Sequence, residues 1–243
     1  MLRVKDKADS YAIDIPGWFS ITPRILIIGK SQYAGKTTVI LNAMLRDTMF
    51  GPYYEGENIY IFSESIATDE KLRKLIDFKK IPESNQISMI DEEIMSELWD
   101  KLQEDYLATV ENKKTPPNVM LIFDDISASG GLKKKKNGMI SRFTCQGRHI
   151  GVGFMMSAQK LSDLPTSTRE NATGVIAFEM SAKQADLLSA DHSFFPKRSS
   201  FINLFNSVIQ EPRDFLIINY SAKTKDERFM DKDLKVIDWH KFL

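Results

Sequence analysis

A glycine-containing stretch that ends in a lysine and two threonines is the part of the chain whose residue types point most directly to chemistry. It spans residues 29–38 and closes with Gly35, Lys36, Thr37 and Thr38. An apolar run, 25–28, precedes it, and a segment of helical pattern follows at 39–47. A strand, a tight loop and a helix in this order form the usual setting of a nucleotide phosphate site. The stretch therefore predicts a phosphate-binding loop.

The residue types assign a role to each part of this loop. Backbone N–H groups of the loop and of the helix N-terminus can bind phosphate oxygens. Gly35 allows close approach of the backbone. Lys36 supplies a cation for the β- and γ-phosphates of ATP, and the Thr37 hydroxyl can bind Mg²⁺. The predicted nucleotide contacts are Gly29, Ser31, Gln32, Tyr33, Ala34, Gly35, Lys36, Thr37 and Thr38.

The loop departs in one respect from the common pattern. The usual motif places its first glycine about five positions before the second, where this chain has Lys30. Gly29 comes one position earlier. Two interpretations stay open: the loop is one residue longer than usual, or its first turn uses a residue other than glycine.

Length and composition restrict the class of protein. The chain has 243 residues, of which 42% are hydrophobic, enough for the core of one α/β domain. Its 33 basic and 33 acidic residues cancel, so any contact with DNA must come from a local patch or from the lumen of an oligomer. A single cysteine, Cys145, excludes an intrachain disulfide and suits a reducing compartment. With no apolar run of membrane-spanning length and no apolar leader, the chain is expected to be soluble and intracellular, with no membrane partner.

Strands that alternate with helical segments predict a mostly parallel sheet with helices on both faces. The expected division is an N-terminal extension (1–22), an ATPase core (23–221) and a C-terminal tail (222–243). Expected strands cover 24–29, 58–62, 86–90, 119–123, 152–158, 175–180 and finally 215–220. Expected helices cover 36–49, 69–78 after a cap at Thr68 or Asp69, 92–110 after a cap at Asp91, and 138–149.

Two carboxylates follow the most apolar of these strands. Residues 119–123 are apolar throughout, as in a buried central strand, and Asp124 and Asp125 come directly after them. Ligands of α/β sheets bind at the carboxyl ends of strands. Asp124 is therefore expected to hold Mg²⁺ together with Thr37, and Asp125 to polarise the water that attacks the γ-phosphate. A plain helix cap or turn is the alternative.

A glutamine ends the next expected strand. Gln159 follows 152–158, and an amide in this place can sense the γ-phosphate and orient the attacking water. Taken alone, Gln159 is an ordinary residue at a strand end. Its position after the strand that carries Asp124 and Asp125 favours a catalytic role.

Several short segments in the second half carry a family resemblance. They are Gly147-Arg148-His149-Ile150-Gly151-Val152, Ala158-Gln159-Lys160, Pro165, Arg169-Glu170-Asn171-Ala172 and Ile176-Ala177-Phe178-Glu179-Met180-Ser181. In this order and spacing they resemble the FtsK–HerA superfamily of P-loop motors, with a RecA/ASCE-like fold. Among these, the chain looks most like the genome-packaging ATPases of poxviruses, other large DNA viruses and virophages. The resemblance covers about 24–190; Asp125 stands where many members have Glu.

The resemblance implies a ring of identical subunits, a pentamer or hexamer, that hydrolyses ATP and drives double-stranded DNA into a capsid. Its partners are then the DNA, further copies of the chain and capsid vertex proteins, at an assembly site in the host-cell cytoplasm or in association with the virion. In such rings an arginine stabilises charge on the transferring phosphoryl group. Arg148 is the first candidate and Arg169 the second. A helix-dipole partner for Arg148 and an ion pair for Arg169 are the structural alternatives.

Three further features are open to a functional and a structural interpretation. The four lysines Lys133, Lys134, Lys135 and Lys136 could bind DNA phosphates without reading sequence, or form a solvated loop. The aromatic segment 191–213 could be a subunit contact or part of the core. His149, His192 and His240 lack the spacing of a zinc site, and no zinc is expected.

Other functions of the phosphate loop remain as alternatives. One is a different DNA pump of the same superfamily, such as a conjugation or chromosome-segregation motor. A nucleotide kinase is another, but it would leave Gln159 unexplained. A nucleotide-dependent switch is the third, and slow hydrolysis indifferent to DNA would support it.

Overall fold

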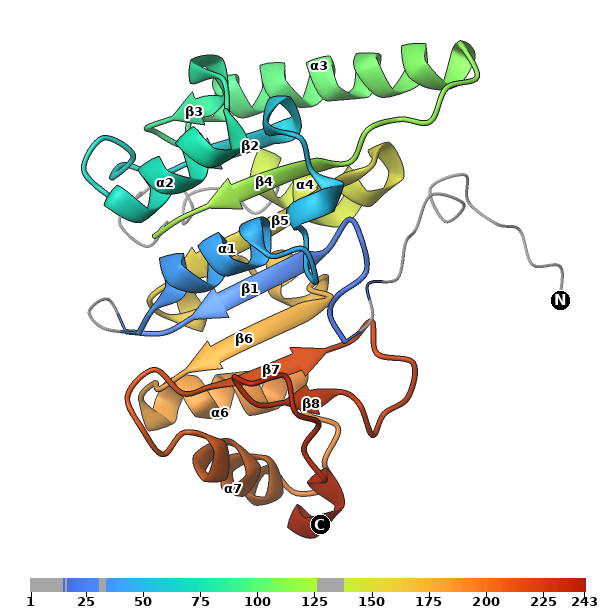
Figure 1. Cartoon of the computed structure of the whole chain (residues 1–243). Coiled ribbons are helices and arrows are strands. Elements are labelled where there is room, and N and C mark those ends of the chain that lie inside the picture. Colours follow the sequence, from blue (N-terminus) through green and yellow to red (C-terminus); the bar gives the residue numbers. More distant parts are fainter. Residues whose placement is uncertain (1–14, 16, 31–33, 126–137) are drawn as a thin grey trace, which may run out of the picture.

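The computed structural model describes residue 15 and residues 17–30, 34–125 and 138–243. These residues form an eight-stranded sheet in the order β3-β2-β4-β5-β1-β6-β7-β8, from top to bottom in Figure 1. The strands are β1 (Arg24–Ile28), β2 (Ile59–Phe62), β3 (Gln86–Ile87), β4 (Val119–Phe123), β5 (Val152–Ala158), β6 (Gly174–Phe178), β7 (Phe215–Asn219) and β8 (Phe229–Met230). The six strands β3-β2-β4-β5-β1-β6 pair in parallel, whereas β7 is antiparallel to both of its neighbours, β6 and β8. The predicted mostly parallel sheet is confirmed.

Helices cover both faces of this sheet, as the sequence predicts. They are α1 (Lys36–Leu45), α2 (Glu70–Lys79), α3 (Glu92–Glu111), α4 (Met139–Gln146), α5 (Thr166–Glu170), α6 (Ala182–His192) and α7 (Arg198–Val208). Side chains alternate along β1: Ile25 and Ile27 join the core beneath α1 and α2, while Leu26 and Ile28 join the core beneath α3, α4, α6 and α7. Burial on both faces explains why the central strands are apolar throughout.

The strand order brings the chemically interesting strand ends together. β5 lies between β1 and β4. Ala158 at the end of β5 pairs with Ile28 at the end of β1, and Met156 pairs with Phe123 at the end of β4. The residues that follow these three strands therefore lie at one edge of the sheet, which is also where α1 begins.

The predicted helix starts are confirmed, whereas two helix ends are shorter than predicted. Asp69 caps α2 by accepting hydrogen bonds from two backbone N–H groups, and Asp91 caps α3 in the same way with one. α1 ends at Leu45 instead of 49, because the chain becomes extended at Arg46 and returns to bury Phe50. α4 ends at Gln146 and continues as a 3₁₀ turn, Gly147–Ile150.

The third strand is also shorter than predicted. The expected strand covered 86–90, but only Gln86 and Ile87 pair with β2. β2 itself ends at Phe62, the partner of Ile87. Beyond that point no backbone of β2 remains to pair with, and the chain turns toward the cap of α3.

The part of the chain after β5 holds elements that the pattern did not indicate. α5, α6, α7 and β8 were not predicted, and 215–220 was expected to be the last strand. β8 instead adds a further strand inside residues 222–243, and its Phe229 is fully buried. Phe19 and Ile21, from the expected extension 1–22, are buried as well. The domain boundaries themselves remain a prediction.

Candidate nucleotide site

The described residues of the turn from β1 to α1 include two glycines with backbone features that a phosphate-binding loop requires. Gly35 has φ of 95°, a left-handed conformation that favours glycine, and its carbonyl oxygen accepts a hydrogen bond from Val39 N–H. Gly29 is required for a different reason: a Cβ atom there would lie 2.7 Å from Cβ of Phe178. Three of the predicted contacts, Ser31, Gln32 and Tyr33, lie outside the described residues.

Lys36 is a buried cation at the start of α1. It is 6% exposed, and its Nζ donates hydrogen bonds to the carbonyl oxygens of Gly29 (3.1 Å) and Lys30 (3.2 Å). Burial lowers the pKa of Lys36, while the nearby carboxylates of Asp125 and Asp124 act to raise this pKa. The ammonium group is thus positioned by backbone oxygens at the opening of the loop, as the predicted role in phosphate binding requires.

Asp124 meets the predicted Mg²⁺ partner directly. Thr37 Oγ1 donates a 2.9 Å hydrogen bond to Asp124 Oδ2, and Ser157 Oγ donates a 2.6 Å hydrogen bond to Asp124 Oδ1. Burial raises the pKa of Asp124, and these two hydrogen bonds oppose that shift. A hydroxyl and a carboxylate are oxygen donors of the kind that Mg²⁺ prefers, so the two side chains fit that ion.

Asp125 and Gln159 come together beside this pair. Gln159 Nε2 lies 3.3 Å from Asp125 Oδ1 and 3.5 Å from Asp125 Oδ2. Asp125 has φ of 50°, and its N–H donates a 2.8 Å hydrogen bond to Ser157 Oγ. The structure therefore gathers a carboxylate and an amide at the ends of neighbouring strands, where they can hold one water between them.

Four of these side chains line a cavity of about 710 Å³, called the nucleotide cavity below: Lys36, Thr37, Asp124 and Asp125. One wall holds Gly35, Lys36, Thr37, Thr38, Asp124 and Asp125. Its volume falls within the range of small-molecule sites. Asp69, the cap of α2, also lines the cavity, and its charge raises the pKa of Asp124.

The first candidate arginine lies away from this cavity in its own chain. Arg148 is exposed in the 3₁₀ turn before β5, whereas Gln159 follows the end of the same strand. A strand of seven residues spans about 23 Å. Arg148 is thus at the opposite edge of the sheet from Asp124 and Asp125.

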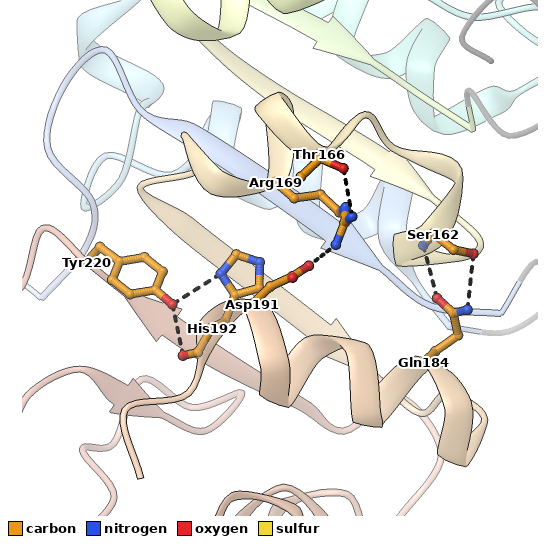
Figure 2. Close-up of polar contacts among 7 residues, drawn as sticks. All are labelled: Ser162, Thr166, Arg169, Gln184, Asp191, His192 and Tyr220. Carbon is orange, nitrogen blue, oxygen red and sulfur yellow. Dashed lines mark hydrogen bonds and ion pairs between the residues drawn. The ribbon is translucent and has the colours of Figure 1, made fainter. Parts of the chain in front are cut away.

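The second candidate arginine belongs to a separate group of polar side chains, the α6 cluster, drawn in Figure 2. Arg169 of α5 pairs with Asp191 of α6 and also contacts Thr166. The cluster consists of Ser162, Thr166, Arg169, Gln184, Asp191, His192 and Tyr220. The ion pair is the structural alternative foreseen for Arg169; a catalytic role for it stays a prediction.

Two other predictions have different outcomes. Lys133, Lys134, Lys135 and Lys136 lie outside the described residues. The aromatic segment is described, and its Phe194 and Phe195 pack against Phe229 and Trp239. The core interpretation of that segment is therefore the one that the contacts support.

In the described part of the chain, no helix is long and apolar enough to cross a membrane.

The sequence did not reveal every residue of the site. Ser157 connects the Asp124 carboxylate to the backbone N–H of Asp125, yet in the sequence it is a single polar residue inside an apolar strand. To place Ser157 beside Asp124, one would have to know which side chains of β5 point to each face of the sheet and how β5 is aligned with β4. Arg213 and Leu234 line the cavity from the C-terminal part of the chain. Nothing in their local pattern distinguishes them from loop residues.

Comparison with known proteins agrees with this geometry. The family model described as "Poxvirus A32 protein" matches residues 20–238. A comparison with curated protein sequences gives no significant match.

Solved structures share the fold. The genome packaging NTPase B204 from Sulfolobus turreted icosahedral virus 2, in complex with ATP-gammaS, has 17% identity and a TM-score of 0.55 over 85% of this chain and 94% of that one. B204 from Sulfolobus turreted icosahedral virus has 17% identity and a TM-score of 0.56 over 89% and 99%. EssC from Geobacillus thermodenitrificans has 15% identity and a TM-score of 0.54 over 80% and 37%. The predicted P-loop ATPase is thereby confirmed, and the chain belongs to the Poxvirus A32 protein family.

Proposed function

We propose that this chain is an ATP-driven motor that moves double-stranded DNA during packaging of a viral genome into a capsid. The observation that carries the proposal is the meeting of Thr37 with Asp124 and of Asp125 with Gln159 at one edge of the sheet. Family membership and the fold shared with B204, a packaging NTPase, supply the biological setting. We expect it to act as a ring of five or six copies at a capsid vertex, in the host-cell cytoplasm or on the virion.

The chemistry follows from the side chains around the nucleotide cavity. Lys36 binds the β- and γ-phosphates and balances their charge. Thr37 and Asp124 hold Mg²⁺, which supplies charge neutralisation on the phosphate oxygens when bound. Asp125 accepts a proton from the attacking water, and Gln159 fixes the orientation of that water. The contact between Asp125 and Gln159 favours hydrolysis over transfer to a nucleoside, as a kinase would perform.

Arg148 completes the site of a neighbouring subunit in this proposal. Its own cavity is about 23 Å away along β5, farther than one arginine side chain can reach. It is exposed, as an arginine that enters another subunit must be. We also propose that Lys133 to Lys136 bind DNA phosphates, which would make binding weaken as salt rises.

ATP hydrolysis, measured at increasing protein concentration with and without linear double-stranded DNA, tests the motor. Turnover per subunit should rise with both, and Lys36→Ala should abolish it. Turnover that ignores protein concentration and DNA would overturn the motor and leave a switch or a kinase.

Mixing two inactive variants tests the shared site. Arg148→Ala and Lys36→Ala should each lack turnover, but a mixture should regain part of it, because the second variant can lend Arg148 to the intact loop of the first. Arg73→Ala, which removes an exposed arginine of α2, is the control and should behave like wild type. Full activity of Arg148→Ala alone would remove Arg148 from the site.

A further inference from the structure

The nucleotide cavity extends past the phosphate loop toward β6 and β7. Asp124, Asp125 and Gln159 lie on the side of β1 that faces β5 and β4. On the other side, Phe178 at the end of β6 pairs with Phe215 at the start of β7, and both line the cavity. Their rings lie 5.0 Å apart at an angle of 58°. If the γ-phosphate points toward β4 and β5, the remaining space on the β6 and β7 side has aromatic walls.

Two turns close this second side, and side-chain contacts hold them together. In the turn at 210–214, Asp214 Oδ2 accepts hydrogen bonds from the backbone N–H groups of Gln210 (3.1 Å) and Glu211 (2.7 Å). Lys232, from the turn at 231–235, donates to the other oxygen of Asp214 at 2.7 Å. We call these the paired turns. Because Asp214 is buried, this ion pair fixes one turn against the other.

The turn at 231–235 is also fixed internally. Asp231 Oδ1 accepts hydrogen bonds from the backbone N–H groups of Asp233 (2.9 Å) and Lys235 (3.0 Å). The neighbouring β8 anchors it to the sheet through β7. These contacts hold the turn in the conformation that presents Lys232, Asp233 and Leu234 to the cavity.

Each of the paired turns places one strained residue at the cavity. Arg213 has φ of 73° and Leu234 has φ of 62°, and both line the cavity. A non-glycine residue in the left-handed region costs on the order of 1 kcal/mol, and such residues gather at ligand sites. Asp125, on the opposite wall, is a third.

We propose that the paired turns bind the nucleoside end of the triphosphate, with Leu234 and Phe215 against the base and Arg213 donating hydrogen bonds to its polar edge. The inference rests on the proposed function, because it needs the phosphates to occupy the loop at Lys36 and Thr37. Apolar and aromatic walls with a few fixed donors are the usual lining of a site for a planar base. The C-terminal segment 222–243 would then belong to the catalytic unit and set its nucleotide preference.

The test compares ATP with inorganic tripolyphosphate, which has phosphates but no nucleoside. The variants are Leu234→Asn and Arg213→Asn, because asparagine accepts a positive φ and these changes keep the turns intact. Lys113→Asn is the matched control: it removes a cation at φ of 56° in a place that does not line the cavity. Dissociation constants for both ligands are measured by calorimetry, with Lys36→Ala as the reference for phosphate binding.

Leu234→Asn and Arg213→Asn should each weaken ATP binding about tenfold, the loss of one good contact, and leave tripolyphosphate binding unchanged. Lys113→Asn should change neither constant. Unchanged ATP binding in both variants, or an equal loss for both ligands, would overturn the inference while the phosphate site stands. If the wild type bound neither ligand, or if Lys36→Ala bound both as tightly as wild type, the proposed function itself would fail.

Discussion

The nucleotide cavity and the α6 cluster both contain charged side chains, but these charges have different partners in the two regions. In the α6 cluster, the guanidinium of Arg169 is held by the carboxylate of Asp191. In the cavity, the described contacts of the Lys36 ammonium are with backbone oxygens, while the two nearest carboxylates, Asp124 and Asp125, are bound by other partners. Removing one partner of a matched ion pair destabilises the fold, whereas a cation that faces a cavity without a carboxylate partner can bind a ligand.

The two regions also differ in shape and in their place on the sheet. The cavity lies at the carboxyl ends of β1, β4 and β5 and is open to solvent. The α6 cluster ties the chain after β5 to α6: Gln184 exchanges two hydrogen bonds with Ser162, and Arg169 reaches Asp191 (Figure 2). Charged groups of the cavity should therefore control activity, and those of the cluster should control stability.

Removing the cavity cation should give the largest effect. Lys36→Ala is expected to lower ATP turnover about 10² to 10³-fold, because charge on the transferring phosphates loses a buried partner. The melting temperature should stay the same or rise, since the variant no longer buries an ammonium group. Steady-state hydrolysis and thermal unfolding measure the two effects.

Lys30→Ala is the matched control, because Lys30 is exposed and pairs with Glu179 on the surface. It should keep turnover within about threefold of wild type, as for most surface substitutions. If Lys36→Ala unfolded the protein instead of only lowering its ATP turnover, the contrast between the two regions would be wrong.

How much of this arrangement the sequence could reveal differs between the two regions. Residues 25–38 and 119–125 are contiguous patterns, in which an apolar run fixes the strand and the polar residues directly after it fix the site. The α6 cluster and the paired turns bring together residues that lie far apart in the chain. Tyr220 meets His192 because β7 turns back along β6, and Lys232 meets Asp214 because β8 turns back along β7. Local pattern contains no information on such pairs.

Ser157→Ala should produce the next effect, and it tests a residue that the pattern did not reveal. The Ser157 hydroxyl donates a hydrogen bond to the Asp124 carboxylate and accepts one from the Asp125 backbone N–H. Alanine removes both bonds, so we expect both aspartates to be held less firmly. Turnover should fall about 10 to 100-fold, as when the support of a metal ligand is removed, and half-saturation should need more Mg²⁺.

Titration of turnover with Mg²⁺ measures this effect. Ser207→Ala is the control, because the Ser207 hydroxyl bonds only to a carbonyl of its own helix α7 among the described contacts. A normal Mg²⁺ dependence in Ser157→Ala would show that Asp124 needs no support from β5.

Arg169→Ala should change stability instead of chemistry. Asp191 and Arg169 are 19% and 11% exposed in their side chains, between a surface pair and a buried one. The loss should be about 2 kcal/mol in the free energy of unfolding, between the values of those two classes. Denaturant unfolding measures it, and turnover of the folded protein should stay near wild type.

A second ion pair on α6 provides the control for Arg169→Ala. Arg198 and Asp186 also pair, but both side chains are about half exposed. Arg198→Ala should therefore cost less than about 1 kcal/mol. If Arg169→Ala instead kept full stability and lost turnover, Arg169 would belong to the catalytic machinery and the distinction between the two regions would fail there.

His192 gives the smallest effect near neutral pH, and it tests how fully the α6 cluster excludes water. Burial, aided by the charge of Arg169, lowers the pKa of His192 to about 4. The Tyr220 hydroxyl donates its hydrogen to the carbonyl oxygen of His192 at 2.9 Å, so the hydroxyl oxygen of Tyr220 accepts from His192 Nδ1–H at 3.1 Å. Nε2 is then the unprotonated nitrogen, and it is buried without a partner among the described residues. A proton there would find no acceptor.

The sign of the pH dependence follows from this low pKa. Between the folded value of about 4 and the unfolded value of about 6.5, the unfolded chain binds more protons than the folded one. The free energy of unfolding should therefore fall as pH drops through this window, by at most about 1.4 kcal/mol per pH unit from His192. His192→Gln should flatten the decline, and His149→Gln, at an exposed histidine, should not. Denaturant unfolding at pH 6.5, 5.5 and 4.5 measures the slopes. Equal slopes in all three proteins would mean that water reaches Nε2, and that the α6 cluster is as open to solvent as the cavity is.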